Sequence, residues 1–244
     1  MAISFIAATG NTQDSAAGDV FTLLKPTGAT TGDVILCGVV MGDTVSTAGA
    51  LPTGWTQVDS DFTTTAGNDG VFIWGYRVVQ AGDPSSWTDG VTPTDADVTC
   101  TITSCYRGVD TTSPIMGSSG VWGANPGTLA SGDVNNTDAG NWAVGVAALI
   151  DETANVPGRS AGDPTASRDS RSLDSGEAAG LQLWDSDGTV ATGNRSFTAS
   201  ESGFTDGLFS GVIILQVSAA PPVSDTAGSS LLVYRQAVNR ASFY

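Results

Sequence analysis

The sequence predicts an all-β protein: an antiparallel β-sandwich, jelly-roll-like, with a short C-terminal extension. The first observation is composition. Of 244 residues, 31 are Gly and only 14% are charged, so most polar residues are Thr, Ser, Asn and Asp, which suit turns and half-exposed strands better than helix interiors. The second is that Gly-Asp or Asp-Gly dipeptides occur ten times along the chain. Because Asp hydrogen-bonds its own backbone and Gly tolerates positive φ, these dipeptides indicate corners between strands.

The third observation is the spacing of apolar residues. Within 97–107, Val98, Cys100 and Ile102 alternate with threonines, which predicts a half-buried strand. Other apolar runs are continuous and bounded by Gly or Asp, which predicts central strands buried on both faces; these are 34–41, 142–150 and 211–217. About ten strands with frequent turn signals favour a sandwich. The remaining expected strands are 3–8, 20–24, 55–58, 71–79, 181–185 and 189–198.

The two halves of the chain contain a faint repetition. Residues 32–36 read Gly-Asp-Val-Ile-Leu, and residues 140–144 read Gly-Asn-Trp-Ala-Val. Each half then passes through a long polar segment to a strand with a tryptophan, Trp74 or Trp184, and ends on an apolar strand. Two stacked half-motifs would form a jelly-roll-like double sheet. A coincidence of composition is the alternative interpretation.

Two polar or terminal segments stand apart from the expected strands. Segment 151–175 contains three arginines among Asp, Ser and Gly, and it is either a solvated surface loop or a contact loop whose arginines reach an acidic neighbour. The arginines are Arg159, Arg168 and Arg171. The sandwich domain is expected to cover 1–218, and a Pro-led extension covers 219–244, because the paired prolines 221–222 cannot continue a central strand.

The extension has an apolar and basic character. Residues 226–244 contain two arginines and no acidic residue, in a chain of net charge −16. A short helix there would be marginal alone and would need a surface to dock on. The extension either packs back on its own body or acts as an arm that docks on a neighbouring subunit. The candidate docking residues are Leu231, Leu232, Tyr234, Arg235, Val238, Arg240 and Phe243.

Composition excludes several classes of function. The chain has no histidine, which removes Ser-His-Asp and Cys-His catalysis and every His-ligated metal site. Neither a P-loop nor a GxGxxG fingerprint occurs, and 25 acidic against nine basic residues disfavour a nucleic-acid partner. Segment 185–188, Asp-Ser-Asp-Gly, begins like a calcium loop but lacks the third ligand and the closing Glu. No enzyme activity, cofactor or metal is expected.

The chain also lacks targeting signals. Its first ten residues have no basic region and no long apolar stretch, so they do not form a signal peptide. The apolar runs fall far below the ~20 residues of a membrane helix, and no membrane partner is expected. Cys37, Cys100 and Cys105 make an odd number and no disulfide framework. Synthesis in the cytoplasm is therefore expected.

Five short motifs follow one another in an order that resembles a known module. They are 32–36 (Gly-Asp-Val-Ile-Leu), 51–56 (Leu-Pro-Thr-Gly-Trp-Thr), 73–79 (Ile-Trp-Gly-Tyr-Arg-Val-Val), 105–110 (Cys-Tyr-Arg-Gly-Val-Asp) and 114–115 (Pro-Ile). The set resembles a β-sandwich module that recurs in virion structural proteins of tailed bacteriophages, over about 18–217. The resemblance implies a structural or adhesion role in the virion, without catalytic residues. Residues 219–244 lie outside the pattern.

Three functions follow. The first is a non-enzymatic virion protein (head decoration, minor capsid or minor tail) that is assembled in the host bacterial cytoplasm and contacts other virion proteins and copies of itself. The second is a receptor- or carbohydrate-binding adhesion module of a phage tail, with a host glycan stacked on Trp87, Trp122 and Trp142, unless these side chains are core. The third is a glycoside hydrolase using a pair such as Glu152 and Glu177, which no spacing singles out. Trp55 is expected in the core.

Overall fold

The fold is known from a computed structural model that describes residues 1–14, 20–42, 49–59, 62–63, 70–91, 98–123, 127–151, 155–174, 178–201 and 207–219. These residues form 18 strands without a helix, and every pairing is antiparallel. The predicted antiparallel β-sandwich is confirmed. The described part of the chain contains no helix long and apolar enough to cross a membrane.

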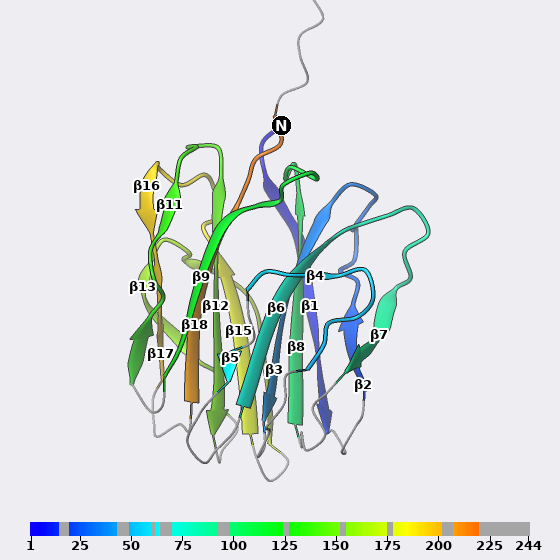
Figure 1. Cartoon of the computed structure of the whole chain (residues 1–244), viewed down its shortest axis with the longest axis vertical. Coiled ribbons are helices and arrows are strands. Elements are labelled where there is room, and N and C mark those ends of the chain that lie inside the picture. The colour runs from blue at the N-terminus through cyan, green and yellow to red at the C-terminus, as the bar shows by residue number, and fades with distance from the viewer. Residues whose placement is uncertain are drawn as a thin grey trace, which may run out of the picture.

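Two long sheets face each other (Figure 1). The first-half sheet has the order β1 (Ser4–Asp14), β8 (Val98–Arg107), β3 (Val34–Gly42), β6 (Gly70–Val78) and β4 (Thr56–Gln57), and β5 (Phe62–Thr63) also pairs with β6. The second-half sheet has the order β14 (Ala166–Asp174), β15 (Ala178–Asp185), β12 (Trp142–Asp151), β18 (Gly207–Leu215) and β9 (Ile115–Gly123).

Short ribbons cover the outer faces of both sheets (Figure 1). On the first-half sheet the ribbon is β2 (Val20–Leu24) paired with β7 (Ser86–Val91). On the second-half sheet there are two, β11 (Val134–Asn136) with β16 (Gly193–Arg195), and β10 (Thr128–Ala130) with β17 (Phe197–Ser200) and β13 (Gly158–Gly162). The molecule is thus a sandwich with an additional layer on each side.

The layers enclose three apolar clusters: one between the two long sheets, and one beneath each set of outer ribbons. Strands β3, β12 and β18 contribute alternate residues to the central cluster and to an outer one, and all their residues are buried. This confirms the prediction of central strands buried on both faces. It also explains why these three runs are continuously apolar: neither face of the strand meets water.

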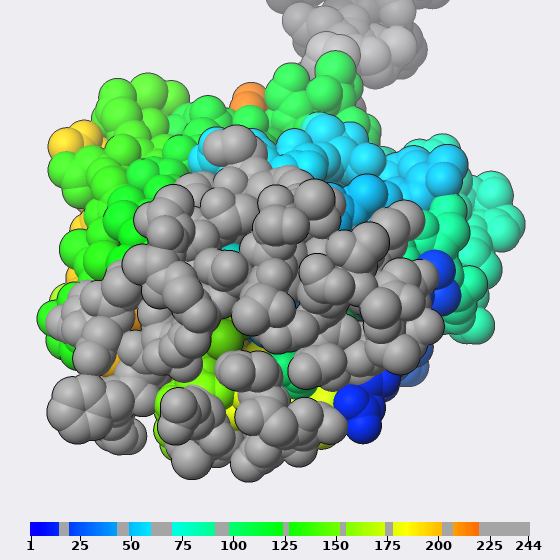
Figure 2. All heavy atoms as spheres, turned by 60° about the horizontal axis from the view of Figure 1, so that its bottom comes forward, coloured from blue at the N-terminus to red at the C-terminus, as the bar shows by residue number. Residues whose placement is uncertain are grey.

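The faint sequence repetition corresponds to a repetition of topology. In the first half β3 lies between β6 and β8, and β1 pairs with β8. In the second half β12 lies between β15 and β18, and β9 pairs with β18 in the same way. Each long sheet therefore comes from one half of the chain, and the halves lie mostly on opposite sides of the molecule (Figure 2). The jelly-roll part of the prediction is not confirmed.

Four local predictions were wrong or incomplete. Strand β8, predicted to be half-buried, is buried on both faces, and its threonine side is covered as well. Segment 151–175, predicted as a polar loop, contains β13 and the nine-residue strand β14. Residues 189–198 do not form one strand, because β16 and the start of β17 divide them between two ribbons. Trp55, expected in the core, is half-buried, because it packs beneath the margin of the β2–β7 ribbon instead of between the sheets.

Candidate functional site

One open hollow is lined by residues at the end of the sandwich that carries the N-terminus, which is labelled N in Figure 1. We call it the terminal cleft; its volume is about 380 Å³. It forms where β3 begins and β8 ends, and Ser218, one residue before the last described residue, is part of its wall. Its lining residues are Met1, Thr30, Thr31, Gly32, Asp33, Arg107, Gly108, Val109, Thr111 and Ser218.

An ion pair between the buried Asp33 and the exposed Arg107 forms one wall of the terminal cleft. Arg107 donates from Nε to Asp33 Oδ1 and from Nη2 to Asp33 Oδ2, both at 2.8 Å. Thr30 adds hydrogen bonds from its backbone N–H and its hydroxyl to Oδ2. Burial alone would raise the pKa of Asp33, but the bonds from Arg107 and Thr30 outweigh it and lower that pKa below its usual value. Asp33 stays ionised and ties the start of β3 to the end of β8.

The second half uses a neutral residue at the corresponding place. Asn141, which directly precedes β12, is fully buried, and its Oδ1 accepts the backbone N–H of Val217 at 2.8 Å. The ends of the two halves also meet: Ser218 N–H donates to Gly108 O, and Asp110 N–H donates to Gln216 O, both at 2.8 Å. The terminal cleft is therefore the junction of the two half-chain sheets.

A second polar cluster joins two of the sequence motifs. Arg77 donates to both oxygens of Asp83, at 3.1 and 2.6 Å, and to the carbonyl of Thr53 at 3.4 Å. Its guanidinium lies 5.3 Å from the centre of the Trp87 ring, which packs edge-on against Trp55 at 5.2 Å. Hydrogen bonding from Arg77 lowers the pKa of Asp83. This cluster holds the 51–56 loop against β6 and β7.

The third cluster explains why segment 185–188 does not need a cation. Arg168 donates to both oxygens of the fully buried Asp185 at 2.7 Å and to Asp187 at 2.5 Å. The guanidinium also stacks 4.2 Å from the centre of the Phe5 ring. Burial, together with the negative charge of Asp185, raises the pKa of the nearby Tyr106. The arginine supplies the positive charge that a calcium ion would otherwise bring.

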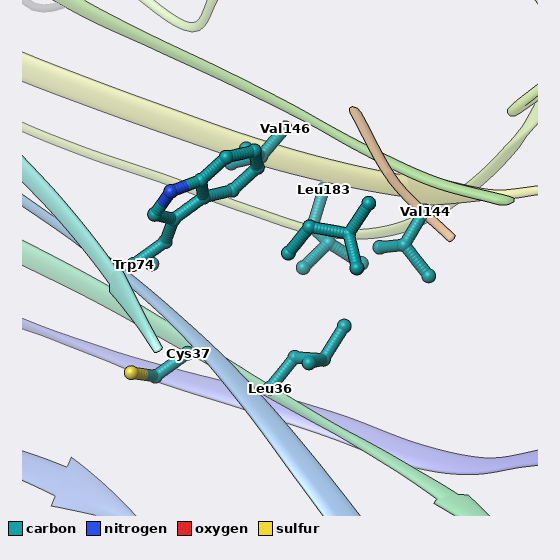
Figure 3. Close-up of a pocket in the computed structure, with 8 residues that line it drawn as sticks. Leu36, Cys37, Trp74, Val144, Val146 and Leu183 are labelled. Carbon is teal, nitrogen blue, oxygen red and sulfur yellow. The ribbon is translucent and has the colours of Figure 1, made fainter. Parts of the chain in front are cut away.

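A small gap lies between the long sheets. Leu36 and Trp74 from one sheet face Val144, Val146 and Leu183 from the other across it (Figure 3). Its wall is apolar, and its free volume of about 10 Å³ is at the lower limit for a single water molecule. The gap is a packing imperfection without groups that bind or react.

The thiols are also inert. All three cysteines are free and buried, and Cys37 points away from the gap between the sheets (Figure 3). Burial raises the pKa of Cys37, and it raises the pKa of Cys100 and of Cys105 to about 12. Because the thiolate is the nucleophile and metal ligand, these groups stay protonated at neutral pH.

The structure corrects part of the predicted glycan site. Trp87 and Trp142 are only 6% and 7% exposed, so neither offers a ring face to a sugar; each closes an apolar cluster. Trp122, on β9, is half-buried against Phe209. The three tryptophans lie in separate elements and form no common platform. The apolar pattern around each tryptophan does not show whether its ring is buried, because the burial depends on which layer of the fold covers the strand.

Other predicted residues lie outside the described part of the chain. These are Glu152 and Glu177, the carboxylates of the hydrolase alternative, and the docking residues Leu231, Leu232, Tyr234, Arg235, Val238, Arg240 and Phe243. Among the residues that are described, no group of three or more His, Cys, Asp or Glu side chains is placed to hold a metal ion. Sequence reasoning missed the Asp33–Arg107 pair, although the signal was present: each residue belongs to one of the five ordered motifs.

Compared with models of protein families, with curated proteins and with solved structures, the chain has no match in any of the three.

Proposed function

We propose that this chain is a non-enzymatic structural protein of a tailed-phage virion: a head-decoration, minor capsid or minor tail component. The observation that carries the proposal is the ordered set of five motifs. Polar contacts join four of them in pairs, and the carbonyl of Pro114 in the fifth accepts the backbone N–H of Gln216 at 2.9 Å. Motif 32–36 is joined to 105–110 through Asp33 and Arg107, and motif 51–56 is joined to 73–79 through Thr53 and Arg77.

Gly108, in motif 105–110, also has a structural role. Gly108 has a φ of 82°, a conformation that glycine adopts without strain, and a Cβ there would overlap the backbone of Ala2. The chain can therefore leave β8 sharply and pass to the second half. Motifs that join strands and fix this corner support a role in shape and contact.

Surface charge fits assembly from soluble subunits. A net charge of −16 keeps free copies apart in the host bacterial cytoplasm before assembly. Five of the arginines are already paired with aspartates of the same chain: Arg77, Arg107, Arg168, Arg171 and Arg195. Contacts with other virion proteins would then depend on apolar burial, which contributes about 25 cal/mol per Å².

The C-terminal extension is the proposed docking arm. It follows Ser218, which lines the terminal cleft, so the arm starts at the junction of the two halves. We propose that Leu231, Tyr234 and Val238 dock on a neighbouring virion subunit. Packing on its own body is the competing possibility, and the following experiment separates the two.

Deletion of 226–244 tests the arm. The truncated chain is supplied to cells infected with a phage that lacks its own copy, and purified particles are examined for the chain by mass spectrometry. We expect a folded, soluble protein that no longer enters particles. A triple change, Leu231→Ser, Tyr234→Ser and Val238→Ser, should have the same effect, whereas Ser229→Ala with Ser230→Ala should not. Unfolding of the truncated chain, or its normal incorporation, would refute the docking arm.

The adhesion alternative now has less support, because Trp87 and Trp142 are buried. A glycan array with the intact chain tests it directly. Binding of one glycan class that is abolished by Trp122→Ala would favour adhesion over a purely structural role.

A further inference from the structure

The second-half sheet ends at β9, and among the described strands none pairs with the outer side of this edge. Strand β9 (Ile115–Gly123) pairs with β18 on one side, and no backbone hydrogen bond from any other described strand or turn reaches its opposite side. It is nine residues long and half-exposed along most of its length. It is also the front strand of its sheet (Figure 1). Unpaired N–H and C=O groups along such an edge are a template for another strand.

The other edges of the two long sheets are protected. Strand β4 has only two residues. Strands β1 and β14 lie against each other, with Arg168 stacked on Phe5 and Arg171 packed over Gly10. Arginine side chains thus cover that margin of the sandwich. Short length and charge are the usual protections of a sheet edge, and β9 has neither of them.

The residues of β9 suit a second copy of the same strand. Its sequence, Ile-Met-Gly-Ser-Ser-Gly-Val-Trp-Gly, contains no charge and no proline. On a chain of net charge −16, an uncharged strip is where two copies approach with least repulsion. The four central residues are Gly or Ser, so no bulky side chain opposes close approach. Ser118 donates to Asp59 at 3.5 Å from the inner face of the strand, the face of its pairing partner Ile213.

We propose that β9 is a self-association edge, at which two copies of this chain pair their β9 strands antiparallel about a two-fold axis. The two second-half sheets then form one continuous sheet across the dimer. Such a contact is isologous, because each copy presents the same strand to the other. The inference deepens the proposed structural function, on which it rests, by naming one contact between copies.

Val121 provides a sharp test. It is 37% exposed on β9, and Val156, 41% exposed and outside β9, is a matched control. Sedimentation equilibrium of the full chain over a range of concentrations should show a dimer for the unaltered protein. Because Val121→Glu places two like charges at the paired edge, we expect self-association to weaken about twofold to fivefold. Val156→Glu adds the same charge elsewhere and should leave it unchanged, as should the uncharged Val121→Thr.

Hydrogen exchange locates the contact independently. The amides of 115–123 should become protected as the concentration rises through the dimer range, and circular dichroism should show that all variants fold. A chain that stays monomeric at every concentration overturns the proposal. So does a dimer that resists Val121→Glu and leaves the β9 amides unprotected. Neither result bears on the virion function, which particle incorporation tests separately. A failure of the chain to enter particles would likewise not contradict a measured β9 dimer.

Discussion

At the scale of single residues, the contribution of a tryptophan to the free energy of unfolding depends on which layer covers its ring. Trp142 is 7% exposed, and its ring meets that of Tyr106 in the central cluster at 6.2 Å. Trp55 is half-buried and meets Trp87 at the margin. Trp142→Ala should therefore destabilise by about 3–5 kcal/mol as a core truncation, and Trp55→Ala by about 1–2 kcal/mol, since less apolar surface is lost.

Urea denaturation followed by far-ultraviolet circular dichroism measures both free energies of unfolding without depending on tryptophan fluorescence. Equal losses for the two variants would contradict the difference in packing described here. The Pro-Thr-Gly-Trp turn by itself predicts that Trp55 lies in the core. The turn is present, with Gly54 at a φ of 83°, but the ring lies at the margin of the β2–β7 ribbon.

The Asp33–Arg107 pair predicts a pH dependence. Because the pKa of folded Asp33 is lowered, its contribution is fully present above the unfolded value of about 3.9, and it is lost as the pH falls through the lower folded pKa. Asp33→Asn should lower the melting temperature at neutral pH, and its difference from the unaltered protein should shrink towards about pH 2. Asparagine is a fitting replacement, since Asn141 holds the corresponding place.

Thermal unfolding at a series of pH values checks this. The exposed Asp133, which accepts one hydrogen bond from Asn194, provides the control: Asp133→Asn should follow the unaltered protein throughout. A constant difference between Asp33→Asn and the unaltered protein down to low pH would show that the ionised carboxylate is not responsible.

At the scale of elements, the gap between the sheets makes Gly38 of β3 a site for gain of stability. A Cβ at Gly38 would lie at ordinary contact distance, 3.4–3.5 Å, from Phe72 and Leu181. Gly38→Ala should stabilise by about 0.4–1 kcal/mol, because the unfolded chain loses freedom and no clash arises. Gly180→Ala on β15 is the contrast: its Cβ would overlap the backbone oxygen of Asn155, so it should destabilise by about 1–3 kcal/mol.

Chemical denaturation of the two variants measures this pair of opposite effects. A loss of stability in Gly38→Ala similar to that in Gly180→Ala would mean that β3 and β15 do not face each other at the observed spacing.

Strand β14 shows the limit of pattern reasoning at this scale. Its residues, Ala-Ser-Arg-Asp-Ser-Arg-Ser-Leu-Asp, have no apolar alternation, so a polar loop was the natural expectation. The segment is a strand because its backbone pairs with β15 from end to end, and because Arg168 and Arg171 form ion pairs with Asp185 and Asp169. Pairing with the following strand, and not the propensity of its own residues, determines such an edge strand.

At the scale of the whole molecule, the two ends of the described sandwich are adjacent: the Met1 amine donates to the carbonyl of Ser218 at 3.2 Å. The link between the halves includes Thr111, Thr112 and Ser113, all exposed. A circular permutant that joins 219 to 1 and opens between Thr112 and Ser113 breaks no strand. It should therefore fold, with a melting temperature close to that of residues 1–219.

Circular dichroism and thermal unfolding check the permutant. A permutant opened between Leu36 and Cys37, inside the doubly buried β3, is the control and should not fold. If both permutants folded, or if neither did, the stability of the protein would not depend on keeping the strands of each half intact.

The sequence by itself determined the strand class and the three doubly buried strands, because the spacing of apolar residues is a local property of the chain. Only the tertiary structure decided that each half builds its own sheet, that β14 is a strand, and that Trp87 and Trp142 are buried. It also decided that Arg107 meets Asp33, 74 residues away. These outcomes depend on which segments pair and on which layer covers a strand, and the apolar pattern of a segment does not encode that choice.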